Sequence, residues 1–345
     1  MILQITPIDT LFFRDSRPFE MGENTWANGV FPPLPTTFLG AIRTAYFSQY
    51  PALLPLANTE QDPTTSLRIR GFYLYKEMVL LPLLSELVSN KEAKEWVFFE
   101  RHAMPSEEEI YSSTQVSLNP YPYEIEPPEG FMDTAILDDF IQDEQSQARE
   151  FVEHDQLLNR EPKIGIGRQN ATKTTATAKL YRVGLQRLEV KGDPNKKLSF
   201  LVDINLEALE ENFVPQLLKL GGEGKLAKVE RYEEDSLDFA QPKLGKCFKL
   251  AFLTPTIFKG GWLPDCFEYD EKQQAYTGTW HGVDLKLLGA FTGKPVPISG
   301  FDIKTRTPKT MYRALPAGSG YHFEVTDETP SEIIYEKFGN PEHPL

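Results

Sequence analysis

Residues 220–231 read LGGEGKLAKVER, and this stretch decides how the N-terminal half of the chain is expected to fold. Glycine occupies three of the four positions 221–224, namely Gly221, Gly222 and Gly224. Glycine adopts positive φ without steric cost and lets the backbone lie close to another group. Two interpretations stay open: a tight turn from a helix into the strand LAKVERY, or a surface whose N–H groups meet a phosphate backbone.

The segments on either side of this turn alternate between strand and helix patterns. Expected strands cover residues 1–6, 67–76, 179–190, 197–204 and 226–232, and expected helices cover residues 36–50 and about 206–220. Pro51 should stop the first helix, and Pro215 should kink or break the second. With a long insertion after the second strand, the order is that of a ferredoxin-like module, an antiparallel four-stranded sheet with two helices on one face.

We therefore expect an α+β fold of two ferredoxin-like (RRM-like) modules, one over residues 1–235 and one over residues 236–345. The first carries an insertion at about 105–162, which is rich in turn residues and holds an acidic amphipathic helix in DTAILDDFIQDEQSQAREFV. Connections this long are usually functional or mobile. The second module starts after the acidic link YEEDSLDFAQP and ends in a short tail, so its completeness stays open.

Charge is spread very unevenly along the chain, whose net charge is −14. Residues 100–161 hold sixteen acidic and three basic side chains, a net of −13. Residues 163–197 hold nine basic and two acidic side chains, and residues 294–313 hold five basic and one acidic. Because exposed charges act over only about 10 Å at physiological salt, the basic segments can still present a local surface for nucleic acid.

No motif of an enzyme, metal or cofactor site stands out. The five histidines include no pair at metal-ligand spacing, and GGEGK lacks both the first glycine and the hydroxyl of a P-loop. We therefore expect no catalytic residue, no metal and no cofactor. One alternative remains, because His102 in FFERHAMP could act as a general acid or base in metal-free RNA cleavage.

The sequence also favours a cytoplasmic protein. The N-terminus lacks the basic flank and the cleavage site of a signal peptide, and no apolar run reaches the roughly 18 residues of a membrane helix. Cys247 and Cys266 give neither a disulfide framework nor zinc spacing, so a reduced setting is expected.

Two basic segments carry signals for RNA binding. LFFRDSRPF places Arg14 and Arg17 on either side of Asp15 among aromatic residues, although a structural Arg–Asp pair explains the pattern equally well. KIGIGRQNATKTTATAKLYR supplies glycines, cations and hydroxyls in what we expect to be a loop. Such a loop can position phosphates without reading sequence, or it can be a flexible connector.

Six segments in order resemble a known family over most of the chain. They are LFFRDSRPF, FPPLPTTFLGAIRTA, IGIGRQNATKTTATAKLYR, LGGEGKLAKVE, LTPTIFKGGWLP and ISGFDIKTRTPKTMYRALPAGSGYHFE. The chain resembles the third Cmr subunits of type III-B CRISPR effector complexes, members of the RAMP superfamily. This resemblance implies a non-catalytic subunit of an antiviral ribonucleoprotein, which binds the 5′ tag of the guide RNA. Its implied neighbours are the large polymerase/cyclase-type subunit and a backbone RAMP subunit.

The resemblance also implies a set of RNA-contacting positions. They are Arg14, Arg17, Arg43, Gly165, Gly167, Arg168, Lys173, Gly221, Gly222, Gly224 and Lys225. Related RAMP proteins mature guide RNA as metal-independent endoribonucleases, which is the main alternative function. A protein-binding adaptor with vestigial RNA loops is a third.

Overall fold

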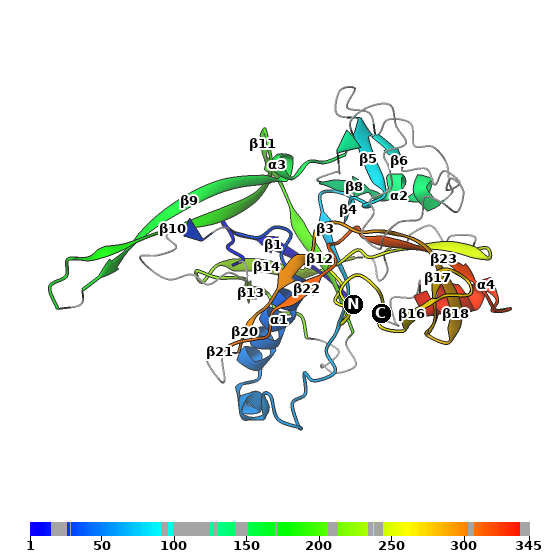
Figure 1. The fold of residues 1–345 in the computed structure, drawn as a ribbon. Helices are drawn as coiled ribbons and strands as arrows, with labels where there is room; N and C mark the ends of the chain where they lie inside the picture. The colour runs from blue at the N-terminus through cyan, green and yellow to red at the C-terminus, as the bar shows by residue number, and fades with distance from the viewer. Residues whose placement is uncertain are drawn as a thin grey trace.

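The computed structural model describes residues 1–14, 26–27, 29–90, 96–98, 125–126, 130–141, 151–169, 171–205, 213–233, 237, 244–302 and 307–338. The expectations for Arg17, His102 and residues 206–212 lie outside these described residues. Figure 1 shows a body built of sheets, with a long two-stranded arm extending from it. None of the described helices is both long enough and apolar enough to cross a membrane.

Strands dominate the described residues. The helices are α1 (Pro35–Gln49), α2 (Thr134–Ile141), α3 (His154–Leu157) and α4 (Ser331–Phe338), with the 3-10 helix η1 (Pro51–Leu56) after α1. Strands of the N-terminal half are β1 (Ile2–Pro7), β2 (Trp26–Ala27), β3 (Ile69–Tyr75), β4 (Val79–Pro82), β5 (Leu87–Asn90), β6 (Trp96–Phe98), β7 (Ile125–Glu126), β8 (Phe131–Asp133), β9 (Leu158–Arg168), β10 (Thr175–Val190), β11 (Asp193–Lys197), β12 (Ser199–Ile204), β13 (Leu217–Lys219) and β14 (Leu226–Arg231). Strands of the C-terminal half are β15 (Cys247–Ala251), β16 (Phe267–Asp270), β17 (Ala275–Trp280), β18 (Val283–Phe291), β19 (Val296–Ile298), β20 (Phe301–Asp302), β21 (Thr307–Pro308), β22 (Tyr312–Ala314) and β23 (Gly320–Val325).

The N-terminal sheet has seven described strands in the order β13-β14-β1-β12-β3-β4-β8. Its central four, β14-β1-β12-β3, pair antiparallel throughout. Together with α1 between β1 and β3, these strands have the order expected for the first module. Four of the five expected strands lie in this sheet, and the fifth, residues 179–190, is part of β10. The second helix of that pattern was expected over about residues 206–220, and residues 206–212 lie outside the described part of the chain.

The core of this half lies between the sheet and α1. Leu3 is fully buried on the central strand, and α1 presents Phe38 and Ile42 to the same space. The Phe38 ring centroid lies 4.9 Å from those of both Phe72 and Phe200. Each such side chain contributes roughly 1.5–3 kcal/mol by leaving water, so this contact fixes α1 on the sheet.

The prediction of a helix that ends at Leu220 is wrong for the residues of that range that the structure describes. Leu217–Lys219 is strand β13, which pairs antiparallel with β14. Leu217 and Lys219 are exposed while Leu218 is buried, which is the period of a strand. Pro215, just before it, cannot supply a helical N–H, so the chain is extended here. The glycine turn is therefore the tip of a β-hairpin.

The basic segment expected as a loop is mostly a two-stranded arm. β9 and β10 pair antiparallel from Leu158↔Leu188 outward to Arg168↔Thr175 (Figure 1). β9 begins at Leu158, inside the range expected for the insertion. The acidic amphipathic helix expected over residues 133–152 is present only in part: Thr134–Ile141 is α2, whereas Asp133 ends β8 and Phe151 and Val152 are not helical.

The C-terminal half has its own sheet and its own core. Five described strands form this sheet in the order β15-β23-β18-β17-β16, and Tyr321 and Phe323 on β23 are fully buried. No helix lies between β15 and β23 in the part of this half that the structure describes, so the ferredoxin-like order expected for the second module is not confirmed. A helix, α4, follows the last strand.

The two halves meet beside Gly318. Ser85 donates its backbone N–H to the Gly318 carbonyl oxygen over 2.8 Å. Glu86 is buried at the same place, with Oε1 at 3.0 Å from Lys249 Nζ and 3.1 Å from His322 Nε2. Backbone and charge contacts therefore join the N-terminal sheet to the C-terminal one.

Candidate nucleic-acid interface

The glycine turn closes the β13–β14 hairpin and packs on the segment that follows β1. Gly221 and Gly224 have φ values of +72° and +68°, which explains glycine at both positions. Gly222 donates its N–H to the Phe12 carbonyl oxygen over 2.8 Å, and a Cβ added at Gly221 would lie 2.5 Å from that oxygen. The close approach that these two glycines allow is thus to the chain itself. Gly224 faces open space, and its contact with phosphate stays a prediction.

Lys225 turns back onto the same segment. Its Nζ lies 3.1 Å from Asp9 Oδ2 and donates to Thr10 Oγ1 over 2.8 Å. The Thr10 backbone N–H and the Lys225 ammonium both lower the pKa of the Asp9 carboxyl. Lys225 is therefore paired with an acid in this structure, although it was expected to face phosphates.

Charged residues at the base of the arm form ion pairs with the same segments, the glycine turn and Asp9. Arg187 on β10 contacts Glu161 Oε1 with Nε at 2.5 Å and Asp9 Oδ1 with Nη2 at 3.1 Å. Lys163 Nζ on β9 lies 2.7 Å from Glu223 Oε2 in the glycine turn, and this contact raises the lysine pKa. We call this group the base cluster, and its members are Asp9, Glu161, Lys163, Arg187, Glu223 and Lys225.

At the tip of the arm the cations have a different setting. Arg168 and Lys173 are both exposed, and Arg168 Nε donates to the Lys173 carbonyl oxygen over 3.2 Å. Lys173 has φ of +61°, and its N–H donates to the Gln169 carbonyl oxygen over 2.9 Å. These bonds fold the tip into a defined turn with two cationic side chains. Among the residues that the structure describes, neither cation forms an ion pair with a carboxylate.

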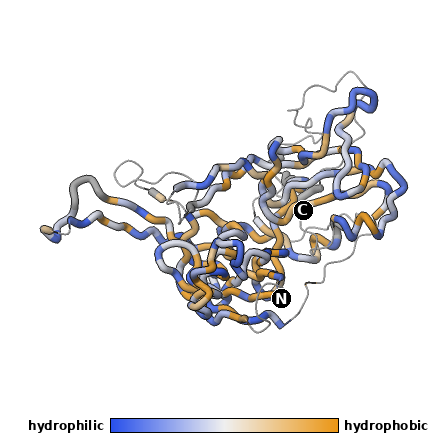
Figure 2. The backbone as a smooth tube through the Cα atoms, turned by 90° about the horizontal axis from the view of Figure 1, so that it is seen from below, coloured by the Kyte–Doolittle hydropathy of each residue, from blue (hydrophilic) through white to orange (hydrophobic). Residues whose placement is uncertain are grey.

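The arm glycines are strand residues. Gly165 is the cross-strand partner of Tyr181, whose ring occupies the space that a side chain at position 165 would need. An aromatic ring over a cross-strand glycine stabilises an otherwise weak strand position. Gly167 lies in β9 two residues nearer the tip. The contact with Tyr181 thus accounts for glycine at position 165, and no ligand is needed to explain it. Figure 2 shows the arm projecting from the body, with hydrophilic and hydrophobic residues interspersed along it.

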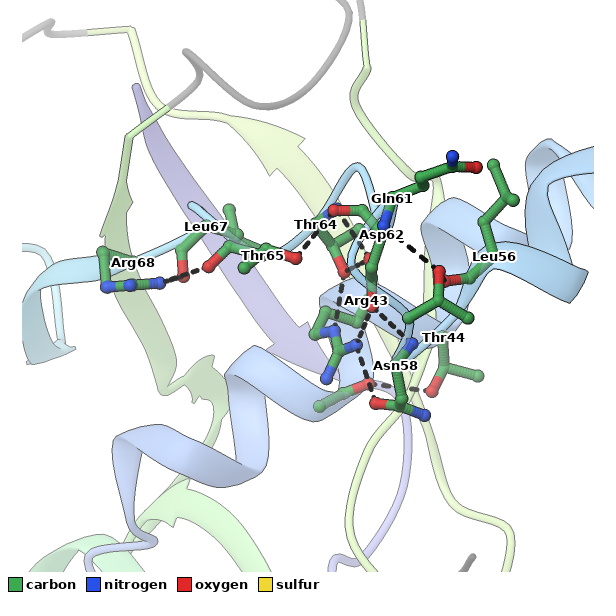
Figure 3. Close-up of polar contacts among 12 residues, drawn as sticks. Arg43, Thr44, Leu56, Asn58, Gln61, Asp62, Thr64, Thr65, Leu67 and Arg68 are labelled. Carbon is green, nitrogen blue, oxygen red and sulfur yellow. Dashed lines mark hydrogen bonds and ion pairs between the residues drawn. The ribbon is translucent and has the colours of Figure 1, made fainter.

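Arg43 lies away from the arm, on α1, and holds a loop (Figure 3). Its Nη2 is 2.7 Å from Asp62 Oδ2, and its Nε donates to Thr64 Oγ1 over 2.8 Å. The Asp62 carboxylate is buried and also accepts the backbone N–H groups of Asn58 and Thr64. Burial raises the pKa of Asp62, but the hydrogen bonds and Arg43 together lower it below its ordinary value. Arg43 therefore has a structural partner, and an RNA contact by it stays a prediction.

Of the two arginines in LFFRDSRPF, only Arg14 is described. It is exposed and forms an isolated antiparallel bridge with Gly29. Arg14 and Arg43 are thus held by different elements from the arm, and RNA contact at these predicted positions remains a prediction. The described residues contain no group of three or more histidine, cysteine or acidic side chains that could hold a metal ion.

Only Lys225 among the members of the base cluster was predicted from the sequence as a site residue. Asp9 and Glu223 lie far from the arm in the sequence, whereas Glu161 is on β9 of the arm itself. Only the fold brings these carboxylates to their cationic partners. The one available signal was the excess of cations in residues 163–197, which predicts that some of them have acidic partners elsewhere.

Comparison with known proteins places the chain in a family. Two solved structures share its fold: a chain of the cryo-EM structure of the Type III-B Cmr-beta bound to cognate target RNA and AMPPnP (state 1), at 17% identity and a TM-score of 0.56, and a chain of the cryo-EM structure of the Type III-B Cmr-beta bound to cognate target RNA, at 18% identity and a TM-score of 0.56. Each match covers 97% of this chain and 92% of the other. No curated protein sequence matches the chain. The family described as CRISPR-associated protein (Cas_Cmr3) matches residues 3–337, and the chain belongs to this family.

Proposed function

We propose that this chain is a guide-RNA-binding, non-catalytic subunit of a type III-B CRISPR effector complex. In this role it holds the 5′ tag of the guide RNA and links the large polymerase/cyclase-type subunit to the backbone subunits. Membership of the Cas_Cmr3 family supports the assignment to CRISPR effector complexes.

The observation that carries the RNA-binding part is the cationic tip of the arm. Arg168 and Lys173 extend beyond the body on a two-stranded ribbon, and neither has an acidic partner among the described residues. Exposed cations and backbone N–H groups bind phosphates and thereby position a strand without reading its bases. A chain with net charge −14 binds polyanions only where such a local excess of cations is held away from its acidic segments.

The test is binding of a tag-bearing guide RNA to the full chain and to the chain assembled with its neighbouring subunits. Affinity should fall steeply as salt rises, because each phosphate contact releases counterions. Absent or salt-insensitive binding in both settings would contradict the proposal. Sequencing the ends of RNA that co-purifies with the assembly tests the preference for the 5′ tag.

The non-catalytic part has its own experiment. The chain is incubated with repeat RNA in EDTA, and wild type is compared with the His102→Ala variant. We expect no discrete cut from either protein. A cut that wild type makes and the variant does not would assign the chain to guide maturation as a metal-independent endoribonuclease.

A further inference from the structure

The base cluster is electrically neutral, although it lies at the root of the most basic segment of the chain. It contains three carboxylates and three cations, and each cation has a carboxylate oxygen within 2.5–3.1 Å. Asp9 forms ion pairs with two of these cations, Arg187 and Lys225, each at 3.1 Å. The cations here are therefore neutralised by the chain itself.

The tip and the base of the arm thus differ in what they offer to a phosphate. At the tip, Arg168 and Lys173 have no competing carboxylate among the described residues. At the base, a phosphate that reaches Lys163 has to replace Glu223, and one that reaches Lys225 has to replace Asp9. These side chains are partly exposed, so exchange of carboxylate for phosphate is physically accessible.

We propose that Asp9, Glu161 and Glu223 are specificity-determining residues, which cancel the base cations against polyanions in general and yield them only to an RNA held in register by other contacts. This inference rests on the proposed function. Non-specific binding of nucleic acid is almost wholly electrostatic, so cancelling cations weakens that binding most. A strand held in register by other contacts depends less on these cations, so it loses less affinity by their cancellation. The base cluster thus discriminates between tag-bearing and unrelated RNA by weakening the binding of the unrelated RNA.

The experiment compares two RNAs of equal length on the full chain, one bearing the 5′ tag and one unrelated, by fluorescence anisotropy over a range of salt. Glu223→Gln frees Lys163 without changing side-chain size. The matched control is Glu268→Gln, which makes the same charge change at an exposed position on β16. We expect Glu223→Gln to tighten binding of the unrelated RNA about two- to fivefold more than the control does, which is the range for exposed ion pairs. The salt slope should rise by about 0.7, the value for one phosphate contact on a single strand.

The ratio of the two affinities should fall in Glu223→Gln, because the tag-bearing RNA gains less. Equal effects of Glu223→Gln and Glu268→Gln, or weaker binding of both RNAs, would overturn the inference while leaving RNA binding intact. Failure of every variant to bind either RNA would instead overturn the proposed function. Asp9→Asn, which frees Lys225 from a different segment, must act in the same direction, and it decides the matter if Glu223→Gln fails to fold.

Discussion

Replacing Gly221 by alanine tests the packing of the glycine turn most sharply. The backbone there has φ of +72°, a conformation that costs an L-residue roughly 1–2 kcal/mol. The new Cβ would also lie 2.5 Å from the Phe12 carbonyl oxygen and 3.2 Å from Phe13 Cδ1. That oxygen is backbone and accepts the N–H of Gly222 over 2.8 Å, so it cannot move away without loss of this bond.

The magnitude follows from these two terms. Relief of an overlap in a packed region costs roughly 1–3 kcal/mol, so Gly221→Ala should lower the free energy of unfolding by about 2–5 kcal/mol in total. Gly224→Ala is the matched control, because Gly224 has φ of +68° and nothing near its missing Cβ. It bears only the conformational term, about 1–2 kcal/mol.

Urea unfolding of both variants and of wild type measures the difference directly. Hydrogen exchange of the β13–β14 hairpin and of the segment after β1 should rise in Gly221→Ala and change little in Gly224→Ala. Equal destabilisation by the two substitutions would refute the contact between the glycine turn and Phe12.

Three further outcomes are expected. Changing Arg168 and Lys173 together to glutamine should lower the salt slope of RNA binding by about 1.4, two contacts at about 0.7 each, and an unchanged slope would remove the arm tip from the interface. In Asp62→Asn, the free energy of unfolding should fall less steeply as the pH is lowered. The folded pKa of Asp62 lies below 3.8, so the stabilisation by its carboxylate is present above that pH and is lost as the pH falls through the folded value. Urea midpoints measured from neutral to acid pH test this. Gly318→Ala places a side chain against the Leu83 carbonyl at a backbone φ of +87°. Hydrogen exchange at the Ser85 N–H, which donates to the Gly318 carbonyl oxygen, should therefore become faster. Unchanged protection of Ser85 would argue against the contact between the two halves.

Local patterns were sufficient to predict the central elements of the N-terminal half. Prolines mark both ends of α1, and its apolar face recurs at helical spacing, so its bounds were predicted closely. Short runs typical of strands likewise predicted β1, β3, β12 and β14, although only β14 alternates between buried and exposed positions and β12 is buried at every position except Asp203. These elements obey local preferences that agree with their tertiary contacts.

Prediction failed where two patterns competed. Leu217 fits a helical repeat with earlier apolar residues, but Pro215 blocks a helix and the chain pairs with β14 instead. In the arm, Ile164 and Ile166 alternate with Gly165 and Gly167 as in a strand, yet these two glycines favoured a loop. Tyr181 resolves that ambiguity by covering Gly165, and a contact from another strand is invisible to local patterns.

The cations of the candidate site were predicted only in part, because Lys163 and Arg187 were not among the expected positions. The sequence identified Arg168, Lys173 and Lys225 as cationic positions, but not that Lys225 is paired with Asp9. Ion pairs between distant segments depend on strand register, which the sequence does not determine position by position. Arg43 was predicted as an RNA contact from the family resemblance, and its ion pair with Asp62, in the loop after η1, was not predicted.

Photo-crosslinking between the arm and the guide measures the central claim most directly. The chain is assembled with its neighbouring subunits and a guide RNA that carries 4-thiouridine in its 5′ tag, irradiated, and digested to identify the crosslinked peptides. We expect crosslinks in peptides that contain the arm tip, residues 168–173, and their loss when Arg168 and Lys173 are changed to glutamine. Tag crosslinks confined to other parts of the chain, and unaffected by those substitutions, would contradict the account.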